Sequence, residues 1–137
     1  MSVSVKGVVE TALYVADLER SVAFYSELFR FPLIFSEGDR LRALSVADKQ
    51  VLLLFRAGAS IQATTTPNGT IPPHDAHGHQ HLAFAIDADQ LQPWRERLKE
   101  NNVGVEGEVD CGGRSVYFRD PDGHLLELIT PGCWAIY

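Results

Sequence analysis

The sequence predicts an α+β fold built from two βαβββ modules. Three observations support this prediction: each half of the chain opens with an alternating strand, continues with an amphipathic helix, and ends with three short strand segments. Module one covers about residues 6–58, residues 59–78 form a connecting loop, and module two covers about residues 79–132. Since 137 residues suit one compact domain, we expect both modules to form a single domain over residues 1–137.

The first module begins with "VVETALYV" at residues 8–15, in which the residues alternate between two faces. Glu10, Ala12 and Tyr14 share one face of this strand. Asp17 is a good helix N-cap, and apolar residues follow it at helical spacing for about three turns. Three strand segments complete the module, at residues 33–35, 40–46 and 50–56.

The second module begins with "HLAFAI" at residues 81–86 and repeats the pattern. His81 occupies the position that Glu10 holds in the first module. Asp87 or Asp89 can cap the helix that follows. The module ends with strand segments near residues 103–109, 115–119 and 124–130, and the "DPDG" before the last one suits a type I turn.

Four histidines fall within eight residues of "HDAHGHQHLAFAID", at the end of the connecting loop. Only His81 lies on an alternating strand. His74, His77 and His79 precede it in a segment rich in Pro and Gly, where a histidine is usually solvated. A loop of this length often covers a functional site. His79 or His74 would therefore suit an acid or base near neutral pH.

The composition narrows the classes of partner. A formal charge of −6 and no cluster of Lys and Arg argue against nucleic-acid binding, and the partner is expected to be a small-molecule substrate. The chain start lacks a signal peptide and "VLLLF" is too short to span a bilayer, so we expect a cytoplasmic protein with no membrane partner. Cys111 and Cys133 are not in CxxC spacing, and we expect them to be free thiols.

Carboxylates in apolar strands indicate a functional site. Glu127 in "LLELI" and Glu10 in "VVETAL" each carry a desolvation cost unless their charge is compensated. The alternative is that each strand face is open to solvent and the carboxylates are simply hydrated. Together with His81, Glu10 and Glu127 would form a ligand set for one divalent ion of Zn, Mn, Fe, Co or Ni. Three protein ligands leave room for water or substrate.

Three segments resemble the vicinal oxygen chelate superfamily, which includes glyoxalase I, fosfomycin-resistance thiol transferases, bleomycin-binding proteins and extradiol dioxygenases. They are "VETALYVADLERSVAFYSELF", "HQHLAFAI" and "GGRSVYFRDPDGHLLELI". The resemblance implies a glyoxalase-like fold, in which two modules form an open, mixed-sheet, barrel-like cleft around a metal, usually in a homodimer. The family's ligand positions fall on Glu10, where a His is normal, and on His81 and Glu127. A fourth ligand found near Leu53 in some members is missing here.

The resemblance implies a divalent-metal-dependent enzyme that uses Lewis-acid activation of a small oxygenated or thiol-conjugated substrate, either as a lyase or isomerase or by thiol addition. Glu127 or Glu10 would be the catalytic base beside the metal. The fosfomycin enzymes carry a Thr two residues after the first ligand, where this chain has Ala12. The expected substrate-binding residues are Tyr14, Tyr117, Ser115, Arg114 and His79.

Two other functions are consistent with the sequence. One is a non-catalytic, metal-free drug-binding protein of the bleomycin-resistance type. The other is an Fe(II) ring-cleaving dioxygenase, although such enzymes favour two His and one carboxylate as ligands. A glutathione co-substrate would call for a basic patch along the cleft, and the sequence shows only scattered arginines.

Overall fold

The computed structural model describes all residues from 1 to 137, and the chain divides into two compact units, residues 1–77 and residues 78–137. Each unit contains one four-stranded sheet and one α-helix, arranged in the same order along the chain. This confirms the predicted α+β class and the two βαβββ modules. Neither sheet closes into a barrel. The assignment of both modules to a single domain stays a prediction.

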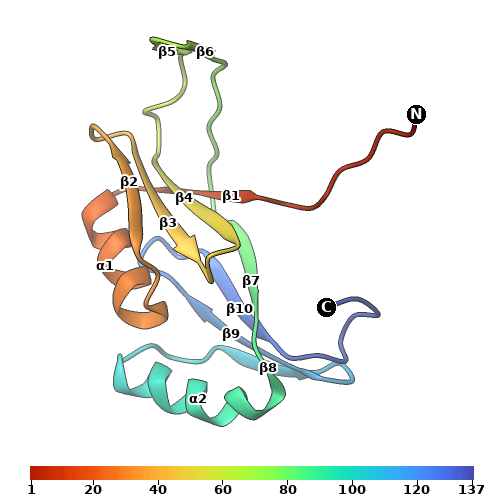
Figure 1. Ribbon diagram of the computed structural model, residues 1–137. Helices are drawn as coiled ribbons and strands as arrows, with labels where there is room; N and C mark the ends of the chain where they lie inside the picture. The colour runs from red at the N-terminus through yellow and green to blue at the C-terminus, as the bar shows by residue number, and fades with distance from the viewer. The chain divides into compact units, whose positions relative to one another are not determined.

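The first unit has the sheet order β1-β4-β3-β2 (Figure 1). β1 runs parallel to β4, and the other neighbours are antiparallel. The elements are β1 (Glu10–Val15), α1 (Leu18–Phe29), β2 (Leu33–Glu37), β3 (Leu41–Val46) and β4 (Gln50–Arg56).

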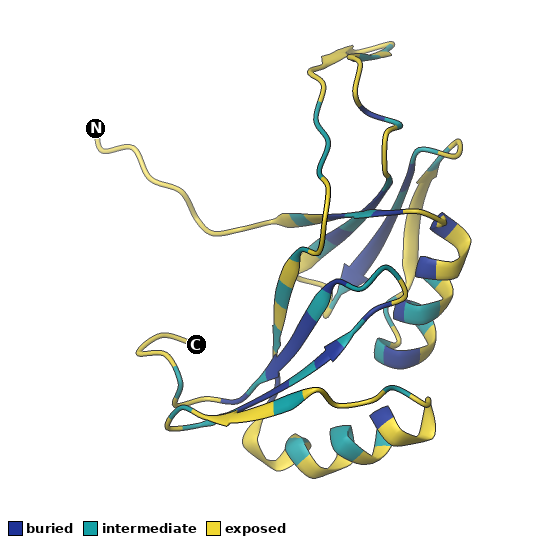
Figure 2. Cartoon of the chain, turned by 180° about the vertical axis from the view of Figure 1, so that it is seen from behind, coloured by how far each residue is buried: buried dark blue, intermediate teal, exposed yellow.

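α1 covers one face of this sheet and builds the core of the first unit. Asp17 caps the helix, because its side chain accepts a hydrogen bond from the backbone N–H of Arg20. The buried helix residues follow helical spacing: Leu18, Ser21, Tyr25 and Leu28. They pack against the sheet face that carries Leu13 and Val15, and Figure 2 shows the buried stripe along the helix in dark blue. The opposite face of β1 is left for Glu10, Ala12 and Tyr14.

The second unit repeats this topology with the order β7-β10-β9-β8, and β7 is again parallel to β10. Its elements are β7 (His81–Ala85), the 3₁₀ turn η1 (Ala88–Gln90), α2 (Leu91–Glu100), β8 (Gly107–Asp110), β9 (Arg114–Arg119) and β10 (Leu125–Ile129). The "DPDG" segment joins β9 to β10 as expected, with the N–H of Gly123 donating to the carbonyl of Asp120. None of the helices combines the length and the apolarity needed to cross a bilayer.

The connecting segment is more ordered than the sequence suggested. It contains a small antiparallel hairpin of β5 (Thr64–Thr66) and β6 (Gly69–Ile71), so the prediction of an irregular loop is wrong over these residues. The two turn residues are Pro67 and Asn68, and proline at the second and Gly69 at the fourth position suit a type I turn. Thr66 stabilises it by accepting from the N–H of Asn68 and donating to the carbonyl of Gly69.

The prediction of free thiols is also wrong, because Cys111 and Cys133 form a disulfide. The cause is strand register: β9 and β10 are antiparallel with Ser115 opposite Ile129, and four more residues of the same register reach Cys111 and Cys133. Their Cα atoms lie 4.7 Å apart, within the range that a disulfide spans. The number and spacing of the cysteines do not predict this bond, because the two residues are 22 positions apart in the sequence and only the strand pairing brings them together.

Candidate functional site

The solvent-facing side of the first sheet carries the polar residues of β1. The parallel register places Glu10, Ala12 and Tyr14 beside Val51, Leu53 and Phe55 of β4, respectively. Leu13 and Val15 lie on the opposite face, in the core. The alternation read from the sequence therefore places Glu10 and Tyr14 on one face, as expected, with an apolar neighbour on β4 beside each of them.

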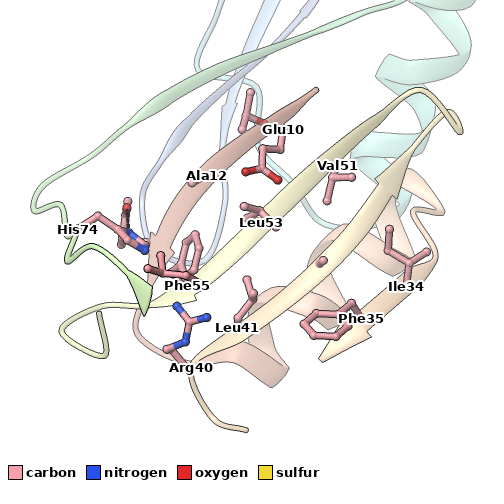
Figure 3. Close-up of a pocket in the computed structure, with 14 residues that line it drawn as sticks. Glu10, Ala12, Ile34, Phe35, Arg40, Leu41, Val51, Leu53, Phe55 and His74 are labelled. Carbon is pink, nitrogen blue, oxygen red and sulfur yellow. Dashed lines mark hydrogen bonds between the residues drawn. The ribbon is translucent and has the colours of Figure 1, made fainter. Parts of the chain in front are cut away.

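This face forms the first-sheet pocket, a hollow of about 670 Å³ (Figure 3). Glu10 lies at one end of it and Arg40 at the other, with Leu53 and Phe55 between them. The lining residues are Glu10, Thr11, Ala12, Tyr14, Ile34, Phe35, Arg40, Leu41, Ala43, Val51, Leu53, Phe55, Ile71 and His74. A pocket of this size accommodates a small organic molecule.

A tyrosine and a histidine close the Arg40 end of the first-sheet pocket. The Tyr14 hydroxyl lies 2.6 Å from Nδ1 of His74, and the Phe55 ring contacts both residues, with centroids 5.6 Å and 4.5 Å away. Burial raises the pKa of Tyr14 above its ordinary value of 10.0, and the negative charge of Asp75 raises it further. The hydroxyl therefore keeps its proton at neutral pH.

The second sheet brings His81 and Glu127 together. His81 is the first residue of β7, and Glu127 is the central residue of the neighbouring strand β10. His81 Nε2 lies 3.1 Å from Glu127 Oε1. The histidine side chain is half exposed, whereas the glutamate side chain is only 9% exposed. A buried carboxylate in an apolar strand thus faces an imidazole nitrogen that solvent can reach.

The other ring nitrogen of His81 fixes its tautomer. Nδ1 lies 2.8 Å from the backbone carbonyl oxygen of Leu125, and a carbonyl can only accept a hydrogen bond. Nδ1 therefore carries a hydrogen, so a protonated ring would donate Nε2–H to Glu127, and a neutral ring would offer the Nε2 lone pair to a cation bound between the two side chains. Metal-binding histidines commonly have this arrangement, with one nitrogen donating to a carbonyl and the other bound to the ion. The donor set of this pair therefore fits a divalent cation.

Ser115 and Tyr117 of β9 complete the surroundings of this pair. The buried Ser115 hydroxyl donates a short hydrogen bond to Glu127 Oε2, which leaves Oε1 directed at His81. Tyr117 is paired with Glu127 across the strands, and its ring stacks on the His81 ring at a centroid distance of 6.3 Å. Four of the residues singled out in the sequence therefore lie together on one face of the second sheet.

The remaining expected site residues lie elsewhere. Arg114 is on the same strand as Ser115 and Tyr117, but the alternation of β9 turns it to the opposite face. The His79 ring covers Gly123 in the β9–β10 turn, where a Cβ would come within 2.8 Å of Nε2. His77 is exposed and lies 3.4 Å from the Asp75 carboxylate.

The first unit supplies Glu10, and the second unit supplies His81 and Glu127. Within neither unit do three or more His, Cys, Asp or Glu side chains gather as a ready metal site. The sequence reasoning missed Phe55 and Arg40 as pocket residues. The alternation of "QVLLLFR" at residues 50–56 carried the signal for Phe55, since it aligns with Val51 and Leu53. No comparable signal pointed to Arg40.

Known proteins of similar sequence and structure include fosfomycin-resistance and glyoxalase-type enzymes. The metallothiol transferase FosB of Staphylococcus epidermidis is 33% identical over 119 residues, covering 85% of this chain and 75% of FosB. The fosfomycin resistance protein FosX of Listeria monocytogenes is 30% identical over 133 residues, covering 90% of this chain and 89% of FosX. The glutathione transferase FosA of Serratia marcescens is 30% identical over 116 residues, covering 85% of this chain and 74% of FosA.

Solved structures agree with these sequence matches. The crystal structure of lactoylglutathione lyase from Agrobacterium tumefaciens superposes with a TM-score of 0.86 at 30% identity, covering 96% of this chain and 98% of the lyase. A FosX variant from Listeria monocytogenes, in complex with Mn(II) and 1S,2S-dihydroxypropylphosphonic acid, gives a TM-score of 0.69 at 26% identity, covering 97% and 94%. A family model described as Glyoxalase/Bleomycin resistance protein/Dioxygenase superfamily matches residues 7–128. The chain belongs to this superfamily.

Proposed function

We propose that this protein is a divalent-metal-dependent enzyme that adds a thiol to, or rearranges, a small oxygen-bearing substrate. The observation that carries the proposal is the His81–Glu127 pair, in which a hydrogen-bonded Nδ1 directs Nε2 toward a buried carboxylate oxygen 3.1 Å away. Such a carboxylate needs a compensating positive charge. A divalent ion would supply it and would be held by His81 and Glu127, with Glu10 of the first unit as the proposed third ligand.

The metal would act as a Lewis acid that polarises a carbonyl, epoxide or oxyanion oxygen of the substrate. Ser115 would hold one oxygen of Glu127 and keep the other free for the ion or for a proton. Glu10 is exposed on the wall of the first-sheet pocket, and its carboxylate is accessible to accept a proton from a substrate bound there. The protonated Tyr14 hydroxyl and His74 would bind a substrate oxygen at the far end of the pocket.

The relatives support both reaction types. FosB is named a metallothiol transferase, FosA a glutathione transferase, and the solved structure from Agrobacterium tumefaciens a lactoylglutathione lyase. Mn(II) is present in the FosX complex, so manganese is a reasonable first candidate among Zn, Mn, Fe, Ni and Co. We propose that the chain uses one divalent ion of this kind.

Metal analysis by mass spectrometry on dialysed, untagged protein tests the proposal. We expect about one first-row metal per chain in the wild type, a strong loss in Glu127→Gln and Glu10→Gln, and no loss in Glu106→Gln, where the carboxylate pairs with Arg119. Metal-loaded protein should consume a thiol in the presence of an epoxide, or isomerise the adduct of glutathione and methylglyoxal. If reconstituted wild type retains no more metal than Glu127→Gln, the enzyme proposal is wrong.

A metal-free ligand-binding protein is the second candidate. The mainly apolar lining of the first-sheet pocket favours it, because such a pocket binds a hydrophobic molecule without any chemistry. The same metal analysis separates the two candidates. A protein without metal that still binds small apolar molecules would support this second function.

A further inference from the structure

We infer that the first-sheet pocket selects an uncharged substrate with an aromatic or branched apolar body, and that it discriminates against phosphonate dianions. This inference rests on the proposed function for its biological meaning, since it names the substrate class of the same site. It separates this chain from the FosX relative, whose structure was determined with a dihydroxypropylphosphonic acid.

The wall of the first-sheet pocket is apolar along most of its length. Val51, Leu53 and Phe55 of β4 form its floor, and Phe35 of β2 and Leu41 of β3 extend it (Figure 3). Phe35 is 54% exposed, and its neighbours Leu33 and Ile34 on β2 are exposed too, so this edge of the pocket presents a contiguous apolar surface to solvent. An apolar body bound here would remove this ring from water, and an aromatic body could also contact the partly exposed Tyr14 ring.

The single cation of this pocket is already neutralised. Arg40 forms an ion pair with Glu37, in which Nε and Nη2 lie 2.6 Å and 2.5 Å from Glu37 Oε2. Its Nη1 donates a hydrogen bond to Ser60 Oγ at 3.1 Å. The guanidinium carbon also lies 5.4 Å from the centre of the Phe55 ring. A dianion would have to compete with Glu37 for Arg40, the only arginine or lysine that lines the pocket.

The Tyr14–His74 pair recognises a neutral oxygen. If Tyr14 donates to Nδ1, the neutral imidazole carries its hydrogen on Nε2, where it can donate to an acceptor oxygen of a ligand. In this tautomer the pair offers one polar hydrogen and carries no net charge. The pair therefore suits a carbonyl, hydroxyl or epoxide oxygen and adds little to the binding of a phosphonate.

A matched pair of ligands tests the inference. 1-Phenyl-1,2-propanediol and (1,2-dihydroxypropyl)phosphonic acid share the same diol and differ in a phenyl group against a phosphonate. Dissociation constants are measured by NMR titration of the full-length, isotope-labelled chain after chelator treatment. We expect the phenyl diol to bind at least about tenfold more tightly and to shift the amides of Tyr14, Leu53 and Phe55.

Three variants separate charge from shape. Leu53→Lys adds a cation to the floor and should reverse the preference, whereas Glu37→Gln releases Arg40 and should improve only the phosphonate. His77→Ala changes an exposed residue outside the pocket and should leave both constants unchanged. The inference is overturned if the wild type binds the phosphonate as tightly as the phenyl diol, if neither compound binds, or if the shifted amides lie outside the pocket.

The outcomes distinguish this inference from the proposed function. The ligand preference is measured without metal, so a chain that retains no metal but prefers the phenyl diol refutes the enzyme proposal and keeps the substrate class. A chain that binds one metal through Glu127 but prefers the phosphonate supports the enzyme proposal and refutes the substrate class.

Discussion

A Ser115→Ala substitution tests whether the buried Glu127 carboxylate depends on its serine donor. Ser115 is 2% exposed and Glu127 is 7% exposed, so water cannot easily replace the lost hydroxyl. A hydrogen bond to a charged group contributes about 1.5–3 kcal/mol to stability. We therefore expect the free energy of unfolding of metal-free protein to fall by about 2 kcal/mol, which lowers Tm by about 6–10 °C in a chain of this size.

Urea unfolding of chelator-treated protein measures this change, and a metal titration measures its effect on the site. Since Ser115 orients Glu127, metal affinity should fall by about tenfold to a hundredfold. Ser21→Ala is the matched control, because the Ser21 hydroxyl is fully buried on α1 without a hydrogen-bond partner. Its removal should leave stability unchanged or raise it. Equal destabilisation by both variants, or no effect of Ser115→Ala, would refute the reasoning.

Three further predictions concern stability. Arg95 holds the pKa of Glu108 below its ordinary value, chiefly through their hydrogen bonds, so the contribution of the pair is present above the unfolded-state pKa and is lost as the pH falls through the folded-state pKa. Arg95→Gln should lower the free energy of urea unfolding by less than about 1 kcal/mol at pH 7, and the difference from wild type should vanish in acid. Gly113→Ala should cost about 1–3 kcal/mol, because a Cβ would overlap the carbonyl oxygen of Pro131, whereas Gly107→Ala meets nothing within 4 Å and should be well tolerated in thermal melts. Reducing the Cys111–Cys133 disulfide should lower the free energy of unfolding by about 3 kcal/mol, given its span of 22 residues, and thiol titration of unreduced protein should find no free cysteine.

The repeated fold was predictable because local signals agree with the tertiary structure. The period-2 pattern placed Glu10 and Tyr14 on one face of β1, and it placed His81 at the matching position of β7. The "DPDG" turn was equally predictable, since proline and glycine occupy positions at which a type I turn favours them. In such segments the sequence neighbours themselves determine the conformation.

Features that depend on strands distant in the sequence were not predictable in the same way. The disulfide follows from the register between Ser115 and Ile129, which residue counting does not contain. Arg40 enters the first-sheet pocket because Glu37 and Ser60, on either side of it in the chain, hold its guanidinium. Arg114 directly precedes Ser115 on β9, and neighbouring residues of a strand point to opposite faces of the sheet. The face that Arg114 occupies therefore depends on the exact position at which the strand begins.

The strand order has a consequence for the speed and order of folding. β1 is an edge strand, and its only partner is β4, so Glu10 meets Val51 across 41 residues of chain. The hairpins from β2 to β4 close short loops and can form within microseconds, whereas β1 has no ladder to join until β4 is in place. The same delay applies to β7, which waits for β10. We expect the strands that carry Glu10 and His81 to dock last in refolding and to exchange their amide hydrogens first in the native state.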